Sequence, residues 1–165
     1  MSNEPKAEII RPPNALKNKV REGGPGAVDV ETLKKAEQVI ENLSGDYLQW
    51  ADEDLKRLGA AFLELKAQPD SAEKLDRVFQ ISHDMKGQGG SFGYDLITII
   101  GNSLCRFIEG LGDAKPKPEQ IDVIAVHMQT MKVVISQRMQ GNGGVEGTKV
   151  LKGLEMVVTK VTKKG

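Results

Sequence analysis

The amino-acid sequence predicts an all-α fold: an antiparallel four-helix bundle with additional N-terminal and C-terminal helices. Apolar residues recur at steps of three and four over most of the chain, as they do along one face of a helix. Short stretches containing glycine and proline separate these periodic segments. No segment combines alternating apolar and polar residues with hairpin turns, so the sequence gives no support to strands.

We divide the chain into three parts. Residues 1–27 contain four prolines and three glycines among mostly polar residues, with too little apolar surface to fold, so we expect a flexible N-terminal arm. Residues 28–140 contain the helical bundle, and residues 141–165 form a C-terminal helix. A chain of 165 residues is long enough for one domain with a substantial core.

Two helices are predicted before Pro69. The first begins after Asp29, a residue suited to an N-cap, and is expected to end near Ser44 and Gly45. The second has the clearest amphipathic pattern in the chain, and Pro69 ends it. The apolar face of the first helix carries Leu33, Ala36, Ile40 and Leu43, and that of the second carries Leu48, Ala51, Leu55, Leu58, Phe62 and Leu65.

Four further helical segments follow. Asp70 and Glu73 predict a capping box at the start of the next helix. The helix after it breaks at the glycines of residues 110–112, and Pro118 suits the first turn of a long helix. Residues 141–144 then turn the chain into the last helix. The apolar faces, in order, are Leu75, Val78, Ile81 and Met85; Leu96, Ile100, Leu104 and Phe107; Ile121, Ile124, Met128, Met131, Ile135 and Met139; Val150, Leu154, Val157 and Val161.

Composition excludes several classes of partner. Lys+Arg and Asp+Glu are equal at 23 each, so there is no overall basic field to hold nucleic acid or an anionic membrane. The single cysteine, Cys105, provides neither an internal disulfide nor a zinc pattern, which favours a cytoplasmic location. Residues 1–11 lack the apolar core of a secretory signal, and no segment reaches transmembrane length.

The segment around His83 carries the chemistry. At about 100° per residue, His83 lies roughly 130° around the helix from the core-facing side. Lys86, Gly87 and Gly90 share the face of His83, because residues three, four and seven apart are neighbours on a helix. The core-facing residues of the segment are Val78, Met85, Gly89 and Phe92.

These residue types suit a phosphoryl group on the imidazole. A histidine near neutral pH has a nucleophilic nitrogen lone pair, and the Lys86 ammonium offers charge and donors to phosphoryl oxygens. Glycine inside a helix costs about 1 kcal/mol relative to alanine, so Gly87 and Gly90 indicate a need for open space beside His83. Spacing alone leaves a second interpretation open, in which Gly87 is a left-handed helix cap beside an ordinary surface histidine.

The run of His83, Lys86, Gly87 and Gly93 resembles the signature of the histidine phosphotransfer (HPt) domain family. The resemblance covers roughly residues 47–139 and implies a four-helix bundle whose second helix carries a phosphate-accepting histidine, assisted by the lysine and the glycine. The family often holds the imidazole with a glutamine on the next helix. Cys105 stands at that position here, and a thiol is a weak hydrogen-bond partner.

The resemblance implies a histidine phosphotransfer protein of a two-component phosphorelay. We expect His83 to exchange a phosphoryl group with aspartates of receiver domains in response regulators or hybrid sensor kinases. Phe79, Gln80 and Gly90 are expected to belong to the docking surface. The chain is expected to be a monomeric phosphoryl carrier rather than an enzyme, with no ATP-binding kinase domain, metal site or cofactor, and with magnesium supplied by the receiver.

Other functions fit the sequence less well. A phosphate-binding loop needs its lysine after the glycines and a preceding strand, whereas Lys86 comes first and lies on a helix. His127 lies at the flank of its apolar stripe, so we interpret it as a boundary residue rather than a metal ligand. The methionines of that stripe are expected in the core. The main alternative is a helical adaptor or scaffold bundle that binds signalling partners without phosphate chemistry.

Overall fold

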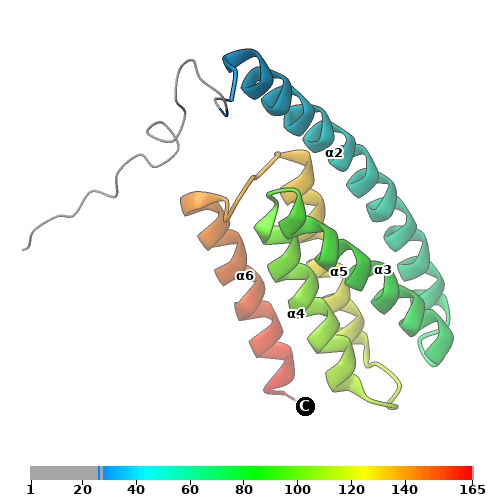
Figure 1. The fold of residues 1–165 in the computed structure, drawn as a ribbon. Coiled ribbons are helices and arrows are strands. Elements are labelled where there is room, and N and C mark those ends of the chain that lie inside the picture. Colours follow the sequence, from blue (N-terminus) through cyan, green and yellow to red (C-terminus); the bar gives the residue numbers. More distant parts are fainter. Residues whose placement is uncertain (1–25, 27, 165) are drawn as a thin grey trace, which may run out of the picture. The chain divides into compact units, whose positions relative to one another are not determined.

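The computed structural model describes residue 26 and residues 28–164 of the chain. The predicted flexible arm, residues 1–27, therefore lies almost wholly outside the described residues. The described part contains five helices and no strands, which confirms the all-α fold class (Figure 1). The helices are α2 (Val30–Ala67), α3 (Ala72–Ser91), α4 (Asp95–Leu111), α5 (Pro118–Ser136) and α6 (Gly144–Thr162).

Helix α2 corrects one prediction. We expected a helix to end near Ser44 and Gly45, but α2 continues through both residues, so the predicted N-terminal helix and the first bundle helix are one element. A single helical glycine costs about 1 kcal/mol relative to alanine. No proline interrupts the segment, and residues 31–43 and 48–67 on either side are rich in strong helix formers such as Leu, Ala, Glu and Lys, so the cost at Gly45 is too small to end the helix.

The chain divides into two compact units, residues 1–42 and 43–165. Within the first unit, α2 begins after Asp29, whose side chain accepts a hydrogen bond from the Glu31 amide at 3.4 Å. The second unit holds the core. There, residues 43–67 of α2 combine with α3, α4 and α5, and successive helices run in alternating directions (Figure 1).

The core is formed by the apolar faces predicted for the four bundle helices. The face predicted for the N-terminal segment is instead exposed, because that part of α2 contributes no side chain to the core; its residues are Leu33, Ala36, Ile40 and Leu43. Fully buried side chains come from all four bundle helices, and Met128 and Met139 pack against them half-buried. Helix α6 packs against α5 and contributes the buried Leu154. The largest buried apolar side chains are Tyr47, Leu58 and Leu65 of α2; Met85 of α3; Leu96, Ile97, Ile100 and Leu104 of α4; and Ile124 and Met131 of α5.

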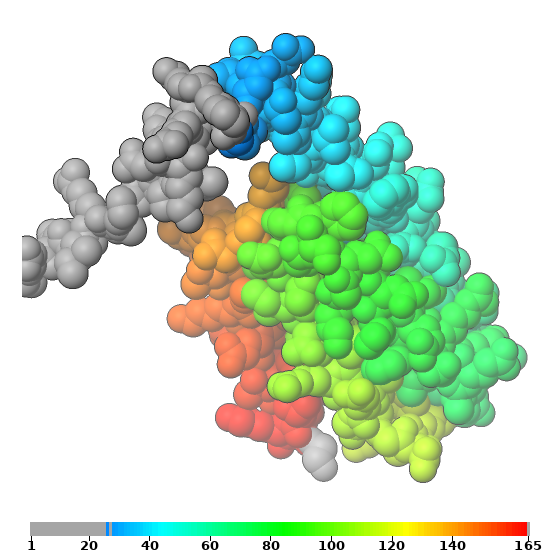
Figure 2. Space-filling model, in the orientation of Figure 1, coloured from blue at the N-terminus to red at the C-terminus, as the bar shows by residue number. Residues whose placement is uncertain are grey.

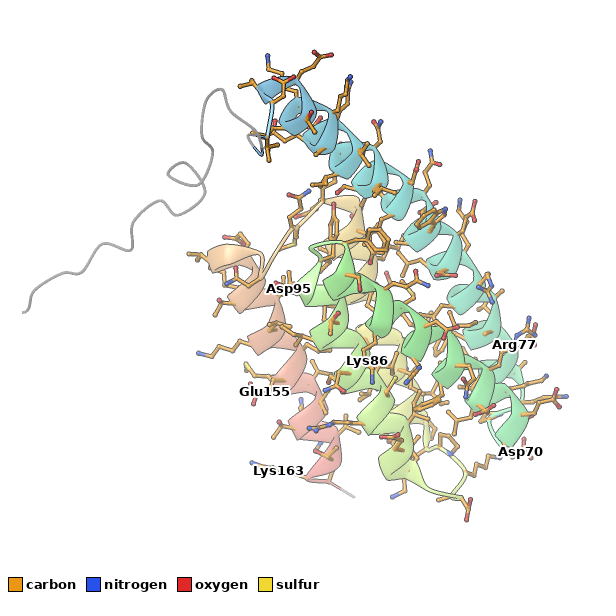
Figure 3. All side chains as sticks on the ribbon, in the orientation of Figure 1. Asp70, Arg77, Lys86, Asp95, Glu155 and Lys163 are labelled. Atoms are coloured by element: carbon orange, nitrogen blue, oxygen red, sulfur yellow. The ribbon has the colours of Figure 1, made fainter. Side chains whose placement is uncertain are left out.

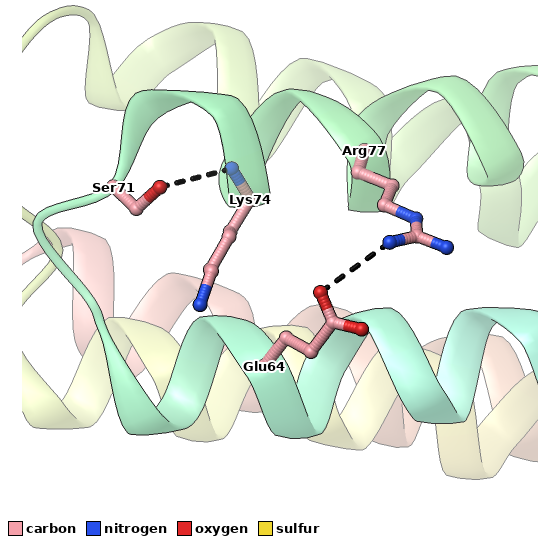
Figure 4. A network of polar contacts seen from close by, with 4 residues as sticks. All are labelled: Glu64, Ser71, Lys74 and Arg77. Atoms are coloured by element: carbon pink, nitrogen blue, oxygen red, sulfur yellow. Dashed lines mark hydrogen bonds and ion pairs between the residues drawn. The ribbon is translucent and has the colours of Figure 1, made fainter.

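The junction between α2 and α3 differs from the prediction at its cap. Asp70 was expected to cap α3, but the helix begins at Ala72 and Ser71 is the N-cap. The Ser71 hydroxyl accepts a hydrogen bond from the Lys74 amide at 3.3 Å, as Figure 4 shows. Asp70 falls instead in the turn closed by the hydrogen bond from the Ser71 amide to the Gln68 carbonyl.

Polar contacts fix two further helix positions. An exposed ion pair joins Arg77 of α3 to Glu64 of α2, with 3.3 Å between nitrogen and oxygen (Figure 4). Helix α5 begins at Pro118, as predicted, and the Gln120 side chain accepts a hydrogen bond from the Lys117 amide at 2.8 Å. Among the described helices, none has the length and apolar character that crossing a membrane requires.

Candidate functional site

Helix α3 carries His83 and runs without a break past it. Gly87 lies inside the helix and does not adopt a positive φ, and α3 ends only at Ser91. The positive φ of +80° belongs to Gly93, in the turn before α4. The structure therefore supports the continuous helix and contradicts a left-handed cap at Gly87.

A close approach of α3 and α4 lies under the segment. A Cβ on Gly101 of α4 would be only 2.9 Å from the Cβ of Lys86 and 3.3 Å from the carbonyl oxygen of Ser82. Only a glycine allows this distance between the two helices. Because α4 lies so close to α3, its next turn stands directly beside His83.

Thr98 of α4 joins the two helices through hydrogen bonds to the backbone of α3. Its hydroxyl donates a hydrogen bond to the Lys86 carbonyl and accepts one from the Gly90 amide, both at 2.8 Å. In a regular α-helix, the Gly90 amide would donate directly to the Lys86 carbonyl four residues earlier. Here the Thr98 hydroxyl lies between the two groups and bonds to both. A Cβ on Gly90 would meet the Thr98 hydroxyl at 3.3 Å, so Gly90 leaves room for this bridge.

His83 lies in a shallow hollow of about 310 Å³ between α3 and α4. The imidazole is exposed and stacks on the ring of the half-buried Phe79, with 6.0 Å between ring centroids. Figure 3 shows Lys86 on α3 at the boundary with α4. The hollow is lined by Phe79, Gln80, His83 and Lys86 from α3 and by Asn102, Cys105, Arg106 and Glu109 from α4.

The charges of the hollow favour an anion on the imidazole. Two cations, Lys86 and Arg106, face one carboxylate, Glu109. None of the three forms an ion pair with another described residue. The ammonium and the guanidinium are therefore free to donate hydrogen bonds to phosphoryl oxygens.

Cys105 occupies the part of the hollow nearest the core. Only 3% of the residue is exposed. Burial raises the pKa of the thiol; the Lys86 ammonium lowers it and Glu109 raises it, with a net increase. The side chain is therefore a neutral thiol near neutral pH, and it can offer the imidazole only a weak hydrogen bond.

The other predicted site residues occupy different positions. Gln80 and Phe79 line the hollow, whereas Gly87 and Gly90 are exposed beside it without lining it. Apart from its two sequence neighbours and the nearby backbone of α3 itself, nothing lies within 4 Å of the position that a Cβ on Gly87 would take. The surface next to His83 is therefore open, as the sequence predicted.

Asn102 and Arg106 were missed by the sequence reasoning. They lie four residues apart on α4 and flank Cys105, so both face the same hollow. Helical periodicity could have indicated them. If Cys105 lies opposite His83, then Asn102 and Arg106, which are three residues before it and one residue after it, lie close to the same face of α4.

Comparison with protein families identifies the family to which the bundle belongs. A family model described as the Hpt domain matches residues 42–136, more than half of the chain. The chain belongs to the Hpt domain family. No curated protein and no solved structure matches the chain. Hpt domains carry phosphoryl groups in phosphorelays and interact with receiver domains.

The match to the Hpt domain covers the bundle and its candidate site. It includes α3, α4 and α5 and the part of α2 that contributes to the core, and it ends at residue 136. Helix α6 lies outside the matched residues.

The second histidine of this Hpt bundle corrects a prediction. His127 was expected at the boundary between the buried and exposed faces of its helix, but it is fully buried between α4 and α5. Its Nδ1 bonds the Val123 carbonyl at 2.8 Å, its Nε2 bonds the Ser103 hydroxyl at 2.9 Å, and its ring stacks on Phe107. Helical periodicity correctly placed His127 beside the apolar face of α5. Because α4 covers this side of α5 as well, the residue is buried rather than partly exposed. Both ring nitrogens are occupied, which leaves neither available to a metal or a phosphoryl group.

Proposed function

We propose that this Hpt domain carries a phosphoryl group on His83 and exchanges it with aspartates of receiver domains. One observation supports this most strongly. An exposed imidazole lies in a hollow with two unpaired cations, Lys86 and Arg106, on a helix whose next turn is opened by Gly87. The other histidine is buried and hydrogen-bonded through both ring nitrogens, which makes it unsuitable as an acceptor.

The transfer needs positioning and neutralisation of charge rather than a catalytic base. As the nitrogen lone pair of His83 attacks, a P–N bond forms, the P–O bond of the aspartyl phosphate breaks, and the carboxylate leaves. Lys86 and Arg106 neutralise the phosphoryl oxygens after transfer. The reverse transfer uses the same contacts, so the geometry is consistent with either direction of phosphate flow.

We assign the remaining components to the partner. Magnesium, which neutralises the phosphate on the aspartate, belongs to the receiver domain, and this chain needs no cofactor of its own. Phe79, Gln80 and the open surface at Gly87 and Gly90 form the docking surface. We expect the chain to act as a monomer in the cytoplasm.

A histidine substitution tests the proposal. His83→Gln is expected to abolish acid-labile, base-stable phosphorylation, both by phosphoramidate and by phosphorylated receiver domains. An exposed side chain contributes little to the core, so the free energy of unfolding should change by less than about 0.5 kcal/mol. Labelling is followed by phosphate-affinity electrophoresis, and stability by chemical denaturation.

The control is His127→Gln, which should retain labelling on His83. Phosphorylation that persists in His83→Gln would assign the acceptor to another residue. Complete absence of labelling in the parent protein, with every donor tested, would favour the alternative of a helical adaptor without phosphate chemistry.

A further inference from the structure

A second and larger groove runs between α4 and α6. It has a volume of about 800 Å³, and α5 closes it at one end through Lys117 and Gln120. Its walls are mainly apolar, with Phe107 and Leu111 on one side and Val158 and Val161 on the other. Ile99, also in the lining, is 45% exposed and adds apolar surface to the groove.

All charges in the lining of this groove have one sign. Arg106, Lys115 and Lys117 are cationic, and no acidic side chain lines the groove. None of the three pairs with a carboxylate among the described residues. An apolar trough with a cationic rim is complementary to a ligand that has one apolar face and one acidic face.

The groove is continuous with the candidate phosphotransfer site. Asn102 and Arg106 line both the groove and the hollow around His83. In Figure 2, α3, α4 and α6 present their surfaces on the face toward the viewer, coloured green, yellow-green and red. A protein docked over His83 therefore meets the groove on the same face of the bundle.

Helix α6, which forms one wall, lies outside the residues matched by the family model. One wall of the groove therefore lies outside the matched Hpt domain, and the other wall lies within it. A neighbouring hollow between α5 and α6 is lined by Glu119 and Asp122 as well as by lysines, so it lacks a rim of one sign.

We propose that the α4–α6 groove binds an acidic amphipathic helix of the protein that exchanges phosphate with His83. Such a helix places its apolar side chains at i, i+3, i+4 and i+7 into the trough, and its carboxylates meet the cationic rim. The assignment to a phosphotransfer partner rests on the proposed function. The groove would add affinity and specificity to a docking surface that is otherwise small.

A peptide tests the groove without a known partner. The probe is a fluorescein-labelled peptide of about 18 residues, long enough for ~27 Å of helix, with leucine at i, i+3, i+4 and i+7, four glutamates on the opposite face and alanine elsewhere to favour the helix. A second peptide carries lysine in place of every glutamate. Binding to the full chain is measured by fluorescence anisotropy, and the site is mapped by amide chemical shifts.

Two variants report on the rim and the trough. Lys115→Glu/Lys117→Glu, in which both residues are exposed, should weaken binding of the acidic peptide by about tenfold or more and reduce its salt dependence. Lys132→Glu/Lys152→Glu makes the same charge change at exposed positions that do not line the groove, and should bind like the parent. Val161→Asp should also weaken binding, whereas Val145→Asp, at a residue 73% exposed on α6, should not.

Several results would overturn the proposal. These are absence of acidic-peptide binding, equal binding of the lysine peptide, or equal loss of affinity in the control variants. Binding of dodecanoate without binding of the peptide would assign the groove to a lipid anion. A dimer that Val161→Asp dissociates would assign it to a second copy of the chain.

Phosphorylation separates this proposal from the proposed function. Labelling of His83 by phosphoramidate should be unchanged in Lys115→Glu/Lys117→Glu. With a receiver that phosphorylates His83, the same variant should raise the KM for phosphotransfer about tenfold and leave kcat unchanged. An unchanged KM contradicts the groove assignment alone, whereas absence of labelling on His83 contradicts the proposed function alone.

Discussion

At the scale of single residues, the two histidines show how surroundings decide chemistry. His83 is exposed beside two cations, and its neighbours leave room for a partner. His127 is buried between two helices, with a backbone carbonyl on one ring nitrogen and the Ser103 hydroxyl on the other. The ring of His83 is accessible to a phosphoryl group on a partner. The ring of His127 instead joins α5 to α4 through its hydrogen bond with Ser103.

Lys86 provides a prediction at this scale. Lys86→Ala removes one of the two cations of the hollow without opening the core, because the lysine is only half-buried. A partly exposed charge pair contributes about 1 kcal/mol, which corresponds to about a fivefold change in rate. In the variant, the phosphorylated form should therefore hydrolyse about fivefold faster, or phosphotransfer should be about fivefold slower. Phosphate-affinity electrophoresis over time measures both rates.

The matched control is Lys132→Ala, which removes an exposed lysine of α5 outside the hollow. This variant should behave like the parent. If Lys86→Ala transfers at the parental rate and its phosphorylated form persists as long, Lys86 does not contact the phosphoryl group.

The sequence led to the site residues of α3, whereas most of the site residues of α4 were missed. Helical spacing places His83, Lys86 and Gly87 on one face, but it left an ordinary surface histidine beside a helix cap equally open, and the resemblance to the HPt signature decided between the two interpretations. Arg106 became part of the site through the packing of α4 on α3, which depends on the missing side chain of Gly101. Helical periodicity does not fix which two faces meet.

At the scale of helices, periodicity identified every bundle element, but it misplaced three ends. The stripe predicted for α5 extends to Met139, whereas the helix ends at Ser136 and the chain turns at Arg138, which has a positive φ of 51°. Gly45 was expected to contribute to a helix end and lies within α2, because one glycine without a proline is a weak helix breaker. Asp70 was expected to cap α3, and Ser71 does so one residue later. Both residue types are good caps, so only the exact start of the helix decides between them.

Helix α3 yields a prediction that separates stability from access. Gly87 is helical and has open space around it, so Gly87→Ala should stabilise the fold by roughly 0.5–1 kcal/mol. Gly87→Leu should fold as well as the parent but transfer poorly, because its side chain projects into the docking surface. Chemical denaturation and phosphotransfer rates from one receiver measure the two effects.

Gly153 of α6 supplies the matched control, because it is also helical, exposed and free of neighbours within 4 Å of a Cβ. Gly153→Ala should give a similar gain in stability, and Gly153→Leu should transfer at the parental rate. A Gly87→Leu variant that transfers as fast as the parent would contradict the argument for steric access.

At the scale of the whole molecule, a buried polar contact joins two bundle helices. The Ser103 hydroxyl of α4 lies 2.9 Å from Nε2 of the buried His127 ring of α5. Burial lowers the pKa of His127, against a smaller raising effect of the hydrogen bond to the Val123 carbonyl. The ring is therefore neutral in the folded protein, and protonation opposes the folded state.

This lowered pKa predicts how stability depends on pH. The unfolded chain binds a proton on His127 with an ordinary pKa of 6.5, whereas the folded chain resists protonation until the pH is lower. The contribution to stability is complete above pH 6.5 and is lost as the pH falls below it. The free energy of unfolding should decrease in this range by at most about 1.4 kcal/mol per pH unit for this one proton.

Denaturation at a series of pH values between 7.5 and 5 measures the slope, and two variants assign it to a residue. His83→Gln leaves His127 as the only histidine of the chain and should keep most of the slope. His127→Gln should be less stable at pH 7.5, because a buried ring and its hydrogen bonds are replaced, but its stability should change little between pH 6.5 and 5.5. If His127→Gln retains the parental slope, another group is responsible and the buried histidine does not link the stability of the bundle to pH.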